Sequence, residues 1–270
     1  MTDRNLTTKR YSQVQMTREG MYLYLPPSDL VEVGGIPGVI DPFAESSGQQ
    51  FPLGTKLVYA EREFRYAKMG ATVGVAGNLY QSVVPLAGRI DEAIGTPAVG
   101  DTTIDFTPNT VTTDDMAADE FADGYLWIND ETGEGEMYRI KSHPAITGGV
   151  SGVITLYDPI RVAPAAAATA TIVHNRWRNV IIHPSPPTAL LAGWTVKAVT
   201  ANYYCWLQTR GPVAALTQGT LIIGDLCAPS ATVNGAVMPS AALETDGPIV
   251  GQVMAVNADT EYAGVWASLP

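Results

Sequence analysis

The sequence predicts an all-β protein, built from β-sandwich or small β-barrel domains behind an extended N-terminal arm. Glycine (26 residues) and proline (19 residues) are abundant, whereas charged residues make up only 16% of the chain. This composition is typical of a turn-rich β-protein rather than of a helical one. Short β-branched and aromatic runs recur between turn residues, at the spacing found in sandwiches and barrels. With 270 residues, 46% of them hydrophobic, the chain can bury a core in one large domain or in two smaller ones.

The first of three expected regions is the arm, residues 1–55. Pro26 and Pro42 interrupt regular structure there. Apolar residues nevertheless recur in 21–25 and 31–40, which a solvated, disordered tail would lack. An extended segment with apolar anchors but no core of its own usually lies along another surface. We therefore expect the arm to pack on a neighbouring subunit or on a partner, and not on its own core.

Residues 56–175 form the second expected region, a β-rich domain. It opens with residues 56–66, whose composition has some helical character. Phe64 and Tyr66 alternate with charged residues, however, and this period of two favours a strand. Further strands are expected over residues 125–128, 137–140, 153–157 and 170–174.

An acidic loop, residues 129–136, joins two of these expected strands into a hairpin. Oxygen ligands close together around glycine are typical of calcium sites, although the EF-hand spacing is missing. Paired carboxylates near the aromatic rings of Trp127 and Tyr138 would also suit a glycosidase cleft. The third alternative, a polar loop in solvent, needs no special pattern and is the one we favour.

Residues 176–270 form the third expected region, a C-terminal domain that resembles a β-barrel. Its densest aromatic segment is 203–208, where alternation directs Cys205 to one face of a strand and Tyr204 and Trp206 to the other. Because large side chains occupy both faces, we expect Cys205 and Trp206 to be buried in a core or a subunit contact. The alternative is a sugar-stacking platform. Further strands are expected over residues 179–183, 195–200, 220–223, 249–256 and 263–267.

Charge falls in blocks along the chain. Residues 101–136 carry eleven acids and no Lys or Arg, residues 139–210 carry seven bases and one acid, and residues 211–270 carry five acids and no base. Separate acidic and basic faces would favour head-to-tail contacts with copies or partners, unless folding mixes the blocks over the surface. The net charge of −11 argues against a nucleic-acid partner, because phosphate binding needs a basic stripe.

No catalytic, cofactor or metal site can be read in the sequence. His143, His174 and His183 form no ligand pattern with one another or with the cysteines, and we expect the three histidines to lie apart. Nucleophile-elbow, phosphate-loop and dinucleotide-binding motifs are missing from the sequence. Cys205 and Cys227 each lie in an apolar run, which predicts buried free thiols. We therefore expect a protein that is not an enzyme and needs no cofactor.

The sequence also bears on the compartment. The first 20 residues are polar and lack the apolar centre of a signal peptide. No apolar stretch approaches the ~20 residues needed to cross a bilayer. We expect synthesis in a cytoplasm and no membrane partner.

Three stretches resemble segments of head-associated proteins of tailed bacteriophages, of the decoration or capsid-cement family. They are residues 64–81 (FRYAK to AGNLYQ), 123–140 (DGYLWIND to GEGEMYRI) and 204–225 (YCWLQTRGP to IIGD). Residues 219–269 also share the small-barrel rhythm of these proteins, whereas the long arm departs from the smallest members. The resemblance rests on packing and turn residues, so it transfers no catalytic role.

The resemblance implies a homo-oligomer, commonly a trimer, seated on the major capsid protein at the capsid exterior of a virion. There it would cement or decorate the capsid lattice. A tail or baseplate β-protein would share the same composition and is one alternative. A carbohydrate-binding adhesin, with Trp127, Trp177, Trp194 or Trp206 in an exposed cleft, is the other. The residues expected at partner interfaces are the arm anchors and the aromatic strand: Tyr22, Tyr24, Ile36, Val39, Phe43, Tyr204 and Trp206.

Overall fold

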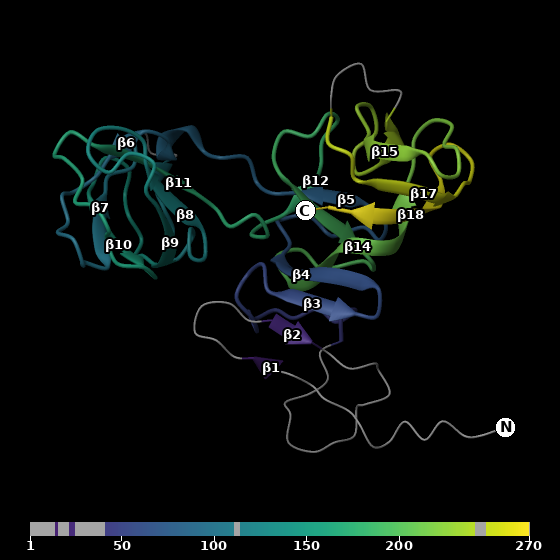
Figure 1. The fold of residues 1–270 in the computed structure, drawn as a ribbon, viewed down its shortest axis with the longest axis horizontal. Helices are drawn as coiled ribbons and strands as arrows, with labels where there is room; N and C mark the ends of the chain where they lie inside the picture. The colour runs from purple at the N-terminus through teal and green to yellow at the C-terminus, as the bar shows by residue number, and fades with distance from the viewer. Residues whose placement is uncertain (1–13, 16–21, 25–40, 111–113, 241–246, 270) are drawn as a thin grey trace. The chain divides into compact units, whose positions relative to one another are not determined.

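The computed structural model describes residues 41–110, 114–240 and 247–269, together with the backbone of 14–15 and 22–24 (Figure 1). Apart from one short 3-10 helix, η3 (Ala87–Arg89), the elements of this part are all strands, so the predicted all-β class is confirmed. No helix in the described ranges is long and apolar enough to cross a membrane. The chain forms two compact units: unit 1 comprises Met1–Ser82 and Trp177–Pro270, and unit 2 comprises Val83–Arg176.

These units differ from the three consecutive regions expected from the sequence. Residues 56–82 belong to unit 1, because β4 (Arg62–Lys68) pairs with β14 (Tyr204–Leu216) far along the chain. Such long-range pairing leaves no local pattern, so the boundary expected after residue 55 lies after Ser82 instead. The second boundary, expected after residue 175, lies after Arg176.

One curled sheet forms most of unit 1. Its hydrogen-bonded neighbours follow the order β1-β2-β3-β4-β14-β18-β17-β15-β16, with β5, β12 and β13 joined beside this path. The pairs are antiparallel except for β2 with β3. The remaining bounds are β1 (Val14–Gln15), β2 (Tyr22–Tyr24), β3 (Lys56–Tyr59), β5 (Leu79–Gln81), β12 (Ile181–Ile182), β13 (Leu191–Thr195), β15 (Leu226–Pro229), β16 (Val237–Pro239), β17 (Gly251–Ala255) and β18 (Tyr262–Ser268).

The long strand β14 organises this sheet. Residues 204–210 pair with β4, and residues 210–216 pair with β18. The strand changes partner at Gly211, whose φ of 85° is one that L side chains rarely adopt. A Cβ there would lie 2.5 Å from the carbonyl oxygen of Glu61, so only glycine fits this crossing of chains.

The expectation that the first half of β14 is buried is confirmed. Cys205 is 3% exposed and Trp206 is 4% exposed. Trp206 packs in an aromatic cluster, which we define as Phe51, Tyr66, Tyr204 and Trp206. Cys205 and Cys227 are both buried free cysteines, as expected.

The end of the expected arm packs on unit 1 itself, which corrects the expectation for residues 41–55. Glu45 accepts hydrogen bonds of 2.8 and 3.0 Å from the backbone N–H and the hydroxyl of Thr200. Leu53 is buried beside Trp206. This segment therefore completes a core that the strands alone leave open. The backbone of β2 also pairs with β1 and β3, and the other residues of 1–40 lie outside the described ones.

Unit 2 is a second curled sheet with its own core. The strand order is β6-β11-β8-β9-β10-β7, with all pairs antiparallel. Alternate residues such as Leu126, Tyr138 and Ile154 point inward to the buried cluster. The predicted hairpin around residues 129–136 is confirmed. The bounds are β6 (Glu92–Ala93), β7 (Thr103–Phe106), β8 (Tyr125–Ile128), β9 (Met137–Ser142), β10 (Gly152–Leu156) and β11 (Thr169–Val173).

Within unit 2, folding mixes the charge blocks. Arg139, from the basic block, lies 2.7 Å from the carboxylate of Asp123 in the acidic block. Arg161, also from the basic block, pairs with Glu136 of the acidic block. The buried Arg89, which belongs to neither block, lies 3.6 Å from Asp114. These pairs bring acids and bases together and weaken the interpretation of separate charged faces.

Candidate interaction site

The histidines are held by backbone groups or by carboxylates rather than gathered in a cleft. In unit 1, His183 is buried, and its ring nitrogens lie 2.8 and 2.9 Å from the carbonyl oxygens of Pro184 and Ala236. In unit 2, His143 and His174 both pack on Phe121, with ring centroids 6.0 and 4.2 Å away. His143 and His174 are therefore neighbours, which corrects the expectation that the three histidines lie apart. Among the described residues, no group of three His, Cys, Asp or Glu side chains could hold a metal ion.

The cysteines are poorly placed for nucleophilic chemistry. Burial raises the pKa of both the Cys205 and the Cys227 thiol to about 12. Both groups therefore stay protonated near neutral pH and act as small apolar side chains in their cores.

The acidic loop 129–136 is tied to a neighbouring strand. Asp130 accepts hydrogen bonds of 2.8 and 3.0 Å from the backbone N–H and hydroxyl of Thr169. Glu136 is paired with Arg161. Two of its carboxylates are thus engaged within the protein, which agrees better with a structural polar loop than with a calcium or glycosidase site.

The four tryptophans proposed for a sugar platform are not exposed. Trp194 and Trp206 are buried, and Trp127 and Trp177 are partly buried. The ring that does reach solvent is Trp266, 42% exposed, which the sequence analysis did not single out. The alternation in residues 262–268 could be read from the sequence, but not which face of that strand lies outside.

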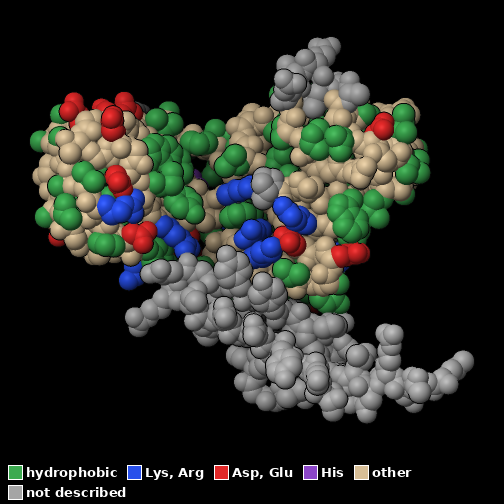
Figure 2. All heavy atoms as spheres, viewed as in Figure 1, with side chains coloured by type: hydrophobic (Ala, Val, Ile, Leu, Met, Phe, Trp, Pro, Cys, Tyr) green, Lys and Arg blue, Asp and Glu red, His purple; other side chains and the backbone are tan. Residues whose placement is uncertain are grey.

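Trp266 belongs to a row of outward residues across four strands of unit 1. Pro212 on β14 pairs with Trp266 on β18, which pairs with Gln252 on β17, and Gln252 pairs with Leu226 on β15. Paired residues point to the same side of a sheet, so these side chains share one surface. Hydrophobic side chains gather over β15, β17 and β18 (Figure 2). We call the following residues the outer apolar face: Pro212, Ala214, Leu216, Leu226, Tyr262 and Trp266.

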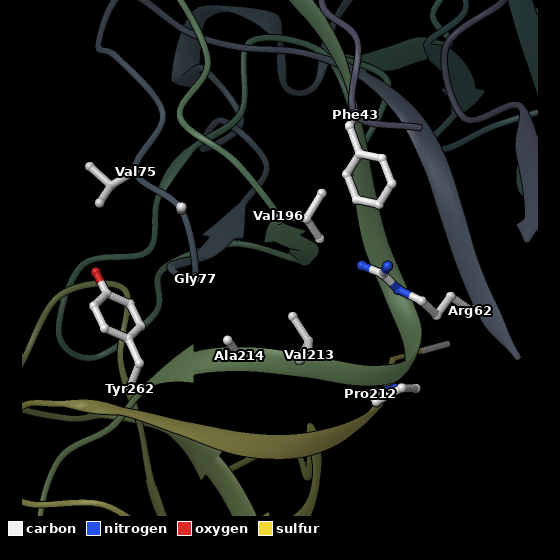
Figure 3. Close-up of a pocket in the computed structure, with 10 residues that line it drawn as sticks. Phe43, Arg62, Val75, Gly77, Val196, Pro212, Val213, Ala214 and Tyr262 are labelled. Carbon is white, nitrogen blue, oxygen red and sulfur yellow. The ribbon is translucent and has the colours of Figure 1, made fainter. Parts of the chain in front are cut away.

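The outer apolar face continues into a groove of about 540 Å³ within unit 1 (Figure 3). The loop before β5 forms one wall, and its Gly77 lies against Tyr262, because a Cβ there would be 2.6 Å from the tyrosine ring. Residues of β14 form the opposite wall. The lining side chains are apolar except for Arg62 and the Tyr262 hydroxyl: Phe43, Arg62, Val75, Val196, Pro212, Val213, Ala214 and Tyr262.

Arg62 is held firmly at the groove. Its Nε and Nη2 donate hydrogen bonds of 2.9 and 2.6 Å to Oε1 of the buried Gln208. The guanidinium also lies over the rings of Phe43 and Phe64, 5.4 and 5.0 Å from their centroids. Desolvation lowers the pKa of Arg62, and the nearby Tyr59 partly offsets this effect. The result is a fixed cation in a largely apolar setting.

The residues expected at partner interfaces lie in different parts of the structure. Phe43 lines the groove. Tyr204 is half-buried and stacks on Tyr66, with ring centroids 5.8 Å apart, and Trp206 lies inside the core. The backbone of Tyr22 and Tyr24 is in β2, whereas Ile36 and Val39 lie outside the described residues.

Neither the outer apolar face nor the groove can be interpreted by analogy. Both consist of outward aromatic and aliphatic side chains beside one fixed cation. No family model, curated protein or solved structure matches the chain.

Proposed function

We propose that this protein is a non-enzymatic structural component of a tailed-phage particle. In this role it binds the major capsid protein at the capsid exterior and cements or decorates the lattice, as a homo-oligomer and most simply a trimer. The resemblance of residues 64–81, 123–140 and 204–225 to head-associated proteins motivates the assignment. The all-β fold of the chain is compatible with it.

The observation that carries the proposal is the outer apolar face of unit 1. A sheet face that presents Trp266, Tyr262 and Leu226 to water is costly unless another surface covers it. Aromatic residues at the centre of a patch are also those that contribute most to binding between proteins. Contacts of this kind, repeated by symmetry over a lattice, give strong attachment from individually weak interfaces.

Trp266→Glu tests the proposal, because it places a charge at the centre of the outer apolar face. We expect the wild-type protein to sediment as an oligomer and to attach to capsids, and the variant to lose both properties while its circular dichroism spectrum is unchanged. Tyr125→Glu is the matched control, since Tyr125 is a similarly exposed ring on β8 of unit 2. A monomeric wild-type protein that binds no capsid would contradict the proposal.

A density map of the intact particle tests the location directly. Density for the chain on the outer capsid surface would support the decoration role. Density in the tail or baseplate would replace it with the alternative of a tail β-protein. The burial of Trp194 and Trp206 makes the carbohydrate-binding alternative the weaker of the two.

A further inference from the structure

The groove of unit 1 lies along the edge of β14 that faces away from β18. Thr217 donates its N–H to the carbonyl of Glu261 (3.0 Å), and Leu269 donates to that of Thr209 (3.0 Å), so the odd-numbered peptide groups of β14 face β18. Leu216 instead donates to the carbonyl of Gly77 (2.9 Å), on the other edge of the strand. Because successive peptide groups alternate, those of residues 212 and 214 also face this second edge. Figure 3 shows β18 on one side of β14 and the groove on the other.

Two features keep part of this edge closed within the protein. The side-chain amide of Gln208 donates to the carbonyls of Arg210 (3.0 Å) and Pro212 (2.8 Å). Pro212 itself has no N–H to satisfy, which is why a proline is tolerated inside this strand. The peptide of Ala214 remains: its N–H points toward the groove and is bonded to no described residue, whereas its carbonyl oxygen lies against Gly77, 3.0 Å from where a Cβ would stand on that residue. A free N–H on a strand edge of this kind can donate a hydrogen bond to the backbone of a bound segment.

The cation beside this edge also lacks an acidic partner. Arg62 forms no ion pair with any carboxylate in the described part of the chain. Only its Nε and Nη2 are bonded to Gln208, which leaves both hydrogens of Nη1 free to bind an anion. Among the described residues that line the groove, Arg62 is the only one with a charged side chain. Charge complementarity therefore calls for a ligand with a carboxylate among apolar groups.

We propose that this groove binds an extended, acidic peptide segment of a partner protein, which accepts a hydrogen bond from the Ala214 N–H and places a carboxylate on Arg62. A backbone carbonyl of the peptide would accept this hydrogen bond, as in other cases where an extended segment binds at a sheet edge. Its alternate side chains would meet Val75, Val196 and Tyr262. The volume of about 540 Å³ is within the usual range for binding pockets and admits a few residues. This inference goes beyond the proposed function and does not depend on it.

The probe is a fluorescein-labelled hexapeptide of alternating valine and glutamate, titrated against the full-length protein by fluorescence anisotropy. We expect saturable binding that weakens with salt and is at least about tenfold tighter than that of the matched valine–lysine and valine–glutamine peptides, because only the first offers carboxylates to Arg62. No saturable binding, or equal affinity for all three peptides, would overturn the proposal.

Variants locate the site. Val75→Trp fills the groove and should abolish binding, whereas Val73→Trp, at an exposed position outside the lining, should leave it unchanged. Ala214→Pro removes the free N–H and should weaken binding about tenfold while circular dichroism confirms the fold. Binding that survives Val75→Trp would place the peptide elsewhere and contradict the proposal. Because Val75→Trp tests peptide binding and Trp266→Glu tests assembly, the two proposals fail independently.

Discussion

Trp206 shows how a single residue supports the core of unit 1. Its ring lies 5.0 Å from that of Tyr66 and 5.5 Å from that of Phe51, in edge-on or tilted contacts. The cluster joins β14 and β4 to the segment before β3, so its removal loosens three parts of the chain at once.

We predict that Trp206→Ala lowers the free energy of unfolding by about 3–5 kcal/mol, the usual cost of deleting a large buried ring. Urea unfolding followed by circular dichroism measures this change. Trp266→Ala is the control, because an exposed ring contributes within about 0.5 kcal/mol to the stability of the separate subunit. Equal losses in the two variants would mean that Trp206 does not lie in a core.

His183 makes the stability of unit 1 depend on pH. Burial lowers its pKa, although the carbonyls of Pro184 and Ala236 oppose this effect by favouring the protonated ring. The unfolded chain, with an ordinary histidine pKa of 6.5, therefore binds the proton more tightly than the folded chain.

We predict that His183 contributes a loss of stability as the pH falls below about 6.5, and no such loss above it. The measurement is the urea midpoint between pH 5 and pH 8 for the wild type and for His183→Gln. The variant should have a flatter profile in this range, because the titrating group is gone. An unchanged slope would show that other groups determine the acid dependence.

At the scale of elements, the sequence predicts strands best where apolar residues alternate over several positions. Residues 263–267 and the hairpin around 129–136 appear as expected. The single strand expected over 56–66 is instead the hairpin β3–β4, because Ala60 takes a positive φ of 52° at a turn that has no glycine. Residues 220–223 form no strand despite their apolar character, since the chain turns there.

The strand β14 was predicted over less than half of its length. The expected strand ended at residue 208, and Gly211 and Pro212 are residues that normally interrupt a strand. The structure uses both residues: Gly211 makes the crossing past Glu61, and Pro212 faces an edge where no N–H is needed. Glycine and proline therefore mark the end of a strand correctly only where the pairing with neighbouring strands also ends.

Gly211 provides a test of that crossing. We predict that Gly211→Ala destabilises the protein by more than 2 kcal/mol, by about 1 kcal/mol from the positive φ and the rest from the clash of the new Cβ with Glu61. Gly224→Ala is the control, because Gly224 has a φ of 91° but nothing within 4 Å of its Cβ position. Thermal unfolding of both variants separates the two contributions. Equal shifts would show that the close approach at Gly211 is not limiting.

At the scale of the whole molecule, the candidate site could not be predicted from the sequence. The groove combines Phe43, Arg62, Val75, Val196 and residues of β14 and β18, which are distant along the chain. No motif joins such positions, and only the pairing of β4 and β18 with β14 brings them together. Residues of the aromatic segment 203–208 were expected at a partner interface instead, but the segment supports the core rather than the surface.

The division into two units indicates that unit 2 can fold without unit 1. Unit 2 is one continuous stretch with its own sheet and its own buried cluster. We therefore predict that the fragment of residues 83–176 folds alone, with a cooperative thermal transition and a β-type circular dichroism spectrum. Tyr138→Ala, which deletes a fully buried ring of that cluster, is the destabilised control. A fragment without a cooperative transition would show that unit 2 needs unit 1 to fold.

Unit 2 is inserted into the sequence of unit 1. The ribosome therefore begins unit 1 first, but unit 2 is the first unit whose residues are all available for folding. Every strand of unit 2 has been synthesised by residue 176. The strand β4, in contrast, lacks its second neighbour until β14, which begins at Tyr204, has been synthesised. During that delay the early hairpin β3–β4 has one long edge without its final neighbour. Nascent chains would therefore be most prone to wrong pairing in this window, and slower translation after residue 216 would do little to help.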